Sequence, residues 1–178
     1  MGRALLVLFA VAALALAGCG GSSDSGPETF SDDEFNVTFE YPGEFDRVDD
    51  INVASTAGGS AKARKGVGLD DHNLIILTRF DLNIAITESN LAKTKEEIDT
   101  VVGQAAGSKV SGERTEAGGM PGYEYRFPIT EPVNGESRFI VLFDGKTEYT
   151  LNCQSTDEKR SDVEAACAMA LETIELKD

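Results

Sequence analysis

Residues Arg138–Gln154 read RFIVLFDGKTEYTLNCQ, two apolar-rich segments on either side of Asp144-Gly145. An Asp-Gly pair tolerates the positive φ angles that tight β-hairpin turns require. We therefore predict two neighbouring antiparallel strands, Arg138–Phe143 and Thr147–Gln154. Asn134-Gly135 predicts another turn just before them. This part of the chain indicates an antiparallel sheet.

Three further strands are predicted upstream of the hairpin. In Phe35–Tyr41, apolar and polar residues alternate with the period of two that is typical of a half-buried strand. Pro42-Gly43 ends that strand. Leu74–Leu82 is more continuously apolar, which favours a central position in the sheet, and Tyr123–Phe127 alternates again.

Two amphipathic helices complete the pattern. The first covers about Ser89–Ala106, and its apolar side carries Leu91, Ile98, Val102 and Ala105. The second is predicted to begin at Ser161, which forms a capping box with Glu164. Its single apolar stripe consists of Val163, Ala166, Cys167, Ala170, Leu171 and Ile174. An antiparallel sheet with such helices lying on it predicts an α+β fold.

Two cysteines fall where sheet and second helix should meet. Cys153 shares a strand face with Tyr149 and Leu151, and Cys167 lies on the inward stripe of the helix. A Cys153–Cys167 disulfide would close a 15-residue loop and add about 3 kcal/mol in the chain-entropy model. Two buried free thiols and a redox pair are the alternatives, although the Cys-x-x-Cys spacing of redox pairs is absent.

The first 18 residues have the layout of a secretory signal peptide. Arg3 supplies one positive charge, and Ala4–Ala17 is an apolar run shorter than the roughly 20 residues of a membrane-spanning helix. The run ends in Leu16-Ala17-Gly18-Cys19, which resembles the lipobox of bacterial lipoprotein precursors. The resemblance implies that a diacylglyceryl group is attached to Cys19, that cleavage follows Gly18, and that the new terminus is acylated. The alternative is an ordinary signal peptide with a chance cysteine.

We expect a lipid-anchored protein on the extracytoplasmic face of the cell membrane. Residues 19–28 provide the lipidated cysteine and a flexible tether with a root-mean-square reach of roughly 15–18 Å. Residues 29–178 are predicted to form a single domain. The formal net charge is −15, and nucleic acid is therefore a poor partner.

Candidate chemistry is sparse. The single histidine, His72, follows Asp70 and Asp71, but no H-E-x-x-H, G-x-S-x-G or Ser-x-x-Lys is present. We expect a solvated loop there, with a metal site as the alternative. The acidic clusters 31–34 and 46–50 do not fit a calcium loop, and weak calcium binding stays open. No cofactor and no catalytic residue is predicted.

One segment is locally basic. Lys62, Arg64 and Lys65 lie within Gly58–Gly68, whose glycines do not match a P-loop. We interpret this segment as a mobile exposed loop. Its three cations are also the best candidates for contact with an anionic envelope component or with a partner's acidic patch.

The order of elements resembles a known family. The segments that carry the likeness are Phe35–Tyr41-Pro42-Gly43, the middle helix, the Gly119–Phe127 strand, and the final hairpin with its closing helix. Their order is similar to that of the PsbP-like lipoproteins of actinobacteria, the LpqN type. The resemblance runs from about Thr29 to Leu176. It implies an antiparallel sheet sandwiched by helices and a place in the cell envelope, and it implies no particular chemistry.

Two function classes follow from these observations. The first is a non-catalytic envelope module that binds a protein, lipid or glycan. The second is an envelope hydrolase whose active site lacks any short linear motif. A sizeable pocket that gathers Asp70, His72 and further polar groups would favour the hydrolase, whereas a broad apolar or basic surface would favour the binding module.

Overall fold

The computed structural model describes residues 26–49, 51, 61–130 and 133–177. The predicted signal peptide, Cys19 and residues 20–25 of the tether lie outside the described residues. The elements in chain order are β1 (Glu28–Phe30), β2 (Val37–Tyr41), β3 (Asp46–Val48), β4 (Ala63–Gly68), β5 (Leu74–Ile86), α1 (Glu88–Ala105), β6 (Glu113–Ala117), β7 (Met120–Ile129), β8 (Gly135–Thr156), α2 (Arg160–Thr173) and β9 (Glu175–Leu176).

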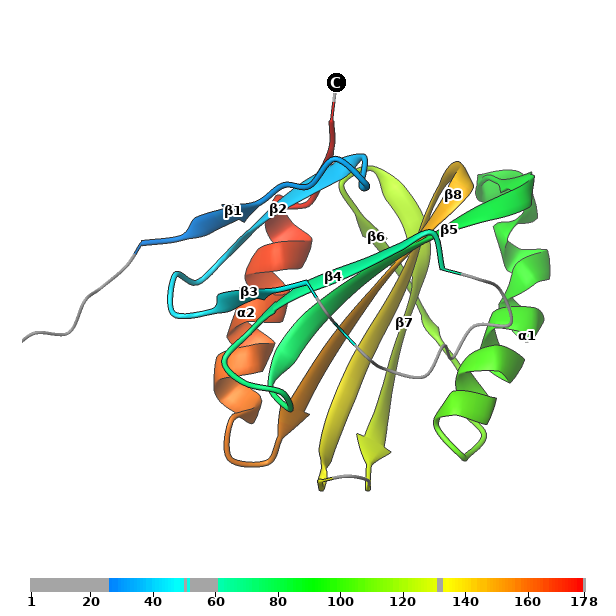
Figure 1. Cartoon of the computed structure of the whole chain (residues 1–178). Coiled ribbons are helices and arrows are strands. Elements are labelled where there is room, and N and C mark those ends of the chain that lie inside the picture. Colours follow the sequence, from blue (N-terminus) through cyan, green and yellow to red (C-terminus); the bar gives the residue numbers. More distant parts are fainter. Residues whose placement is uncertain (1–25, 50, 52–60, 131–132, 178) are drawn as a thin grey trace, which may run out of the picture.

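A large antiparallel sheet forms the centre of the fold. Its order is β3-β4-β5-β8-β7-β6, and a small sheet of order β1-β2-β9 lies beside it. Helix α2 and helix α1 lie on different sides of the large sheet (Figure 1). This α+β arrangement agrees with the predicted fold class.

The element β8 folds back on itself at the predicted turn. A straight 22-residue strand would be about 70 Å long. Instead the Ser137 Oγ lies 2.7 Å from the Asn152 Oδ1, and Gly145 between them has a φ of 56°. The two arms of β8 therefore lie side by side, one paired with β7 and the other with β5 (Figure 1). The predicted hairpin is confirmed.

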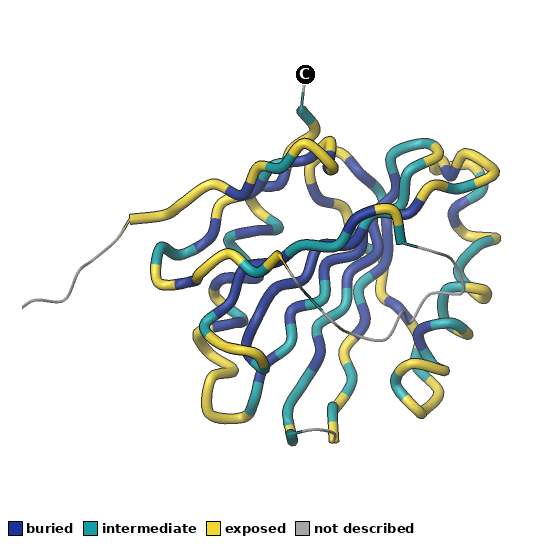
Figure 2. The backbone as a smooth tube through the Cα atoms, viewed as in Figure 1, coloured by how far each residue is buried: buried dark blue, intermediate teal, exposed yellow. Residues whose placement is uncertain are grey.

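Strand alternation sends successive side chains to opposite sides of the large sheet. On the α2 side, Leu77, Tyr149 and Leu151 are fully buried. They pack in one hydrophobic cluster with α2 and with aromatic side chains of the small sheet, among them Phe39. Figure 2 shows buried positions running along the central strands, with exposed positions gathered on the loops and outer helix faces.

The α1 side has a separate and smaller cluster. It contains Ile86, Leu91, Val102, Tyr123, Tyr125, Val141 and Phe143. The Tyr125 hydroxyl donates a 2.8 Å hydrogen bond to Asp99 of α1, and the Gly112 N–H donates to the same carboxylate at 3.0 Å. Burial and the hydrogen bond to Asp99 raise the pKa of Tyr125. These contacts fix α1 over β7.

Both helices begin within one residue of their predicted starts. The predicted capping box of α2 is wrong. Helix α2 begins at Arg160 with Lys159 as its N-cap, so Ser161 is already inside the first turn. The Glu164 carboxylate instead forms an ion pair with Arg126 of β7. In α1 the Asn90 side chain accepts a 2.8 Å hydrogen bond from the Thr87 N–H at the helix start.

Candidate functional site

A cavity of about 690 Å³ lies between α1 and the large sheet. Its volume is in the range of small-molecule sites, roughly 300–1,000 Å³. Helix α1 contributes one wall, β4, β5, β7 and β8 form the floor, and residues 81–84 of β5 form a rim. The cavity lies between the middle of the sheet and α1, which is tied to β7 through Asp99.

The walls of the cavity are largely apolar. Their side chains come from α1 and from alternate positions of the strands, and they include Phe80, Ile98, Val101, Val102, Phe139, Val141 and Phe143. Ile84 at the rim is 62% exposed, the highest exposed fraction of any large hydrophobic side chain in the described part of the chain. Such a lining favours a ligand with a hydrocarbon portion.

One end of the floor is polar. Thr78, Thr150 and Ser137 are buried there, and the half-buried Asn152 lines the same end. Ser137 and Asn152 are joined by their 2.7 Å hydrogen bond, and the Arg64 Nε donates to the Thr78 hydroxyl at 3.4 Å. Hydroxyl and amide groups of this kind fix the orientation of a bound molecule.

Glu148 is a carboxylate on the cavity floor without a partner in the described part of the chain. It projects from the second arm of β8, opposite Phe80 of β5 in the register. No hydrogen bond or ion pair joins it to any described residue, and burial alone raises its pKa to about 7. A carboxyl group perturbed by burial inside a pocket is a functional-site candidate.

The charged side chains that line the cavity are mostly acidic. Besides Glu148 they are Asp81, Glu97 and Arg64. Asp81 lies 3.6 Å from the Lys62 ammonium and 3.3 Å from the Arg79 guanidinium. These two cations offset the charge of Asp81, so Glu148 is the lining carboxylate that would favour a positively charged group in a ligand.

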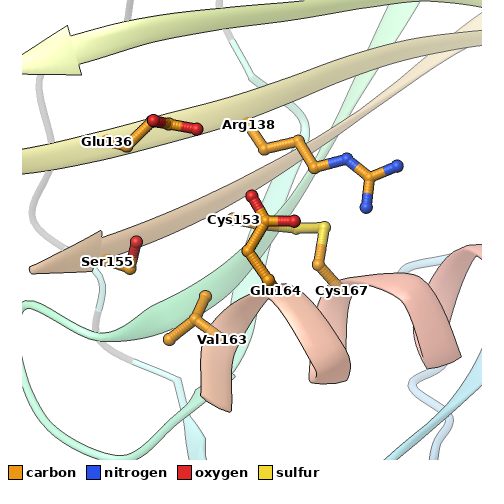
Figure 3. A pocket seen from close by; sticks show the side chains of 7 residues that line it. All are labelled: Glu136, Arg138, Cys153, Ser155, Val163, Glu164 and Cys167. Carbon is orange, nitrogen blue, oxygen red and sulfur yellow. A yellow bond between two sulfur atoms is a disulfide. The ribbon is translucent and has the colours of Figure 1, made fainter. Parts of the chain in front are cut away.

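The Cys153–Cys167 disulfide is present on the other side of the sheet. Its sulfur atoms are 2.02 Å apart, and the two residues are 3% and 0% exposed. Arg138 of β8 and Glu164 of α2 lie close to it (Figure 3), and the hollow beside it has no space for a water-sized molecule. A bond sealed from solvent in this way suits a structural role better than a redox role.

The basic segment is not the exposed loop that the sequence predicted. Ala63–Gly68 forms β4, which pairs with β3 and β5, and residues 58–60 lie outside the described part. A Cβ on Gly66 would lie 2.6 Å from the Ile75 carbonyl oxygen, so the glycine permits this close pairing. The glycines of this segment suggested a mobile loop, whereas in the structure Gly66 allows β4 to lie close to β5.

The strand also separates the three predicted partner-binding cations. Arg64 lines the cavity, and Lys62, just before β4, faces Asp81. Lys65 points to the other side, 3.8 Å from Glu34 and 3.5 Å from Asp49. They do not form one patch, and their contact with a partner stays a prediction.

Asp70 and His72 lie in the β4–β5 loop, outside the cavity lining. Asp70 accepts hydrogen bonds from the His72 N–H at 2.8 Å and from the Asn73 side chain at 2.9 Å. Burial opposes ionisation, but these hydrogen bonds outweigh it and lower the pKa of Asp70. Asn73 in turn accepts from the Thr156 N–H at 2.8 Å, so the group connects the loop to the end of β8. No metal-ligand cluster occurs among the described residues.

Sequence reasoning missed Glu148. Glu148, Thr150 and Asn152 alternate with apolar residues, which is the pattern of a strand with one solvated face. The available signal lay in the neighbouring segments, where Phe139 and Val141 share that face with Phe80 of β5. Apolar neighbours on the same face indicate that the carboxyl group lies in a covered site.

The comparisons with known proteins identify the fold. No family model matches the chain, and no curated sequence matches it significantly. The solution structure of cyanobacterial PsbP (CyanoP) from Synechocystis sp. PCC 6803 is similar with a TM-score of 0.57 and 12% identity, over 90% of this chain and 98% of that one. A Bacteroides thetaiotaomicron VPI-5482 crystal structure has a TM-score of 0.54 and 11% identity, over 86% of this chain and 49% of that chain.

LpqN of Mycobacterium tuberculosis, described as involved in cell envelope biogenesis, is also similar, with a TM-score of 0.49 and 11% identity over 87% of this chain and 94% of that one. At these identities the likeness concerns the fold alone, and the fold is PsbP-like. Among the described residues, no helix is both long enough and apolar enough to cross a membrane.

Proposed function

We propose that this protein is a non-catalytic binding module that takes an amphipathic small molecule into the cavity between α1 and the large sheet. The observation that carries the proposal is the cavity itself, about 690 Å³ with apolar walls and a polar end. The apolar portion of the ligand is removed from water along α1 and the aromatic strand residues, which supplies about 25 cal/mol for each Å² buried. The hydroxyl and amide groups of the floor then orient its polar portion.

The proposal includes attachment to the outer face of the cell membrane through lipid on Cys19. Its support is the Leu16–Cys19 sequence after a short apolar run. Two or more acyl chains anchor a protein stably, and the short tether keeps the cavity near the lipid surface. Replacing Cys19 with Ala should move the protein from the detergent phase to the aqueous phase in Triton X-114 partitioning. Unchanged partitioning would contradict lipid attachment.

A hydrolase is the weaker alternative. A carboxyl group with a pKa of about 7, as burial gives Glu148, suits a general base. Among the described residues, however, no hydroxyl or thiol lies within hydrogen-bonding distance of that carboxylate. Asp70 and His72, the other candidates, serve the β4–β5 loop instead. Binding needs no further group, and the geometry supports it better.

Filling the cavity tests the proposal. Val101 lines the cavity from α1, whereas Ala92 is exposed on the same helix. Displacement of the fluorescent probe 1-aminoanthracene by dodecanol should be at least tenfold weaker for Val101→Trp than for the wild type. The matched control Ala92→Trp should bind like the wild type. Equal binding by both variants, or no binding by the wild type, would contradict a ligand site at α1.

A further inference from the structure

Glu148 differs from the other carboxylates that contact the cavity. Asp81 has two cations within 4 Å, and Glu97 is exposed on α1. Glu148 stands on the floor of the cavity, and in the described part of the chain it has neither an ion pair nor a hydrogen bond. The fold thus places a half-buried carboxylate among apolar walls, and no described group pairs with it.

An arrangement of this kind costs stability. A buried carboxylate loses hydration, and without a partner it is driven toward its protonated form. Burial accordingly raises the pKa of Glu148 to about 7, so near neutral pH the ionised and neutral forms have similar populations. A ligand that brings a positively charged donor to this oxygen would remove the penalty, and a ligand that brings a second anion would increase it.

The charges facing the cavity point in the same direction. Asp81 lies on β5, Glu97 on α1 and Glu148 on β8, against Arg64 on β4. Arg64 is engaged at Thr78 through its Nε, at 3.4 Å. The lining residues of β7, Phe127 and Ile129, carry no charge. Glu148 is the carboxylate that stands on the floor, together with the polar groups that would receive the head of an amphipathic molecule.

We propose that the cavity selects apolar molecules that carry a protonated amine, with Glu148 accepting a charge-assisted hydrogen bond from the ammonium group. This inference rests on the proposed binding function and specifies its ligand class. The hydrocarbon part lies along α1 and the aromatic strand residues, while the ammonium group lies at the floor. A hydrogen bond to a charged group of this kind corresponds to about 10- to 100-fold in affinity.

The selection has a defined pH dependence. An ammonium ligand requires ionised Glu148, whose population rises from about one tenth at pH 6 to about nine tenths at pH 8 when the carboxyl pKa is about 7. The apparent affinity for an amine should therefore rise about tenfold over this range, because only the competent fraction binds. A carboxylate ligand should show the opposite trend.

The test compares three probes of equal chain length below their micelle-forming concentrations: dodecylamine, dodecanol and dodecanoate. Wild-type protein at pH 8 should bind dodecylamine at least tenfold more tightly than dodecanol, and dodecanoate more weakly than dodecanol. Glu148→Gln should remove the preference for the amine and leave dodecanol binding within about twofold. Glu96→Gln, which removes the same charge at an exposed position of α1 outside the cavity lining, should keep the preference.

The outcomes separate the two proposals. Equal binding of dodecylamine and dodecanol by the wild type would overturn amine selection. A preference that survives Glu148→Gln would overturn the assignment of that selection to Glu148. Either result would leave the cavity as a ligand site. Failure of all three probes to bind would overturn the binding function, and amine selection with it.

Discussion

The two faces of the large sheet are made by the same strands but are covered in different ways. Under α2, Leu77, Tyr149 and Leu151 are fully buried, and the disulfide joins the helix to β8. Under α1, the same strands present Phe80 and Glu148 to a cavity of about 690 Å³. Alternation along each strand thus divides the chain's residues between a packed core and an open site.

This difference indicates a division of roles. Protein interiors are normally packed as tightly as organic crystals, so a large cavity costs stability that a purely structural face would not give up. A half-buried carboxylate with no partner among the described residues adds to that cost. We infer that the α2 face holds the fold together and that the α1 face carries the function.

The largest expected effect distinguishes the two faces by truncation. Leu77→Ala removes a fully buried side chain from the α2 face and should lower the free energy of unfolding by about 2–5 kcal/mol. Ile98→Ala, on the cavity side of α1, removes a half-buried side chain and should cost about 1 kcal/mol. Urea denaturation measures both. Equal losses would contradict the claim that the faces differ in packing.

Removal of the disulfide should rank next. The double change Cys153→Ala and Cys167→Ala opens a 15-residue loop and should cost about 3 kcal/mol in denaturation experiments. Because the bond lies on the α2 side, probe binding in the cavity should persist under native conditions. Loss of binding with little loss of stability would reverse the roles assigned to the two faces.

Much of the fold follows from local sequence patterns. Period-two alternation predicts β2 and β7, a continuous apolar run predicts β5, and Asp144-Gly145 predicts the hairpin, because these signals need only neighbouring residues. Cys167 lies on the apolar stripe of α2, and Cys153 lies on the strand face that meets this helix, so the two positions together indicate the disulfide. The capping box fails because Glu164 has a stronger partner in Arg126, far away in sequence.

The candidate site is less accessible to such reasoning. Glu148 belongs to a polar alternation that looks solvated until α1 is placed over it. The basic segment reads as a loop, yet Gly66 is required for the close approach of β4 to β5. Both features depend on which elements meet in space, and a single strand's pattern does not contain that information.

A third prediction concerns the energetic cost of the carboxylate in the cavity. Burial raises the pKa of folded Glu148 to about 7 from the usual 4.5. The folded carboxyl group keeps its proton where the unfolded one has lost it, so its contribution to stability falls as the pH rises from about 4.5 to 7. Glu148→Gln should therefore add about 1–3 kcal/mol at pH 8 and nothing at pH 4.

Chemical denaturation at the two pH values measures this effect. The matched control is Glu97→Gln, at an exposed position of α1. A destabilising Glu148→Gln at pH 8 would mean that the carboxylate is stabilised by the fold. The cavity would then be the one remaining feature by which the α1 face costs stability and the α2 face does not.

The smallest effect is expected at the basic strand. Lys65 lies on the α2 side of β4 with two acidic neighbours at 3.5–3.8 Å. Partly exposed ion pairs of this kind contribute about 0–1 kcal/mol, so Lys65→Ser should change stability little and probe binding not at all.

If the segment contacts an anionic envelope partner, replacing Lys62, Arg64 and Lys65 with Ser should lower capture of that partner in a salt-dependent manner. Capture that is unchanged at low salt would exclude that contact.

Amide hydrogen exchange with and without dodecylamine tests the central claim most directly. Because the ligand is proposed to lie between α1 and the sheet, its addition at pH 8 should slow exchange in Glu88–Ala105 and leave exchange in Arg160–Thr173 unchanged. The Glu148→Gln variant should show weaker protection at a dodecylamine concentration that half-saturates the wild type. Protection centred on α2, or none in either helix, would contradict the assignment of function to the α1 face.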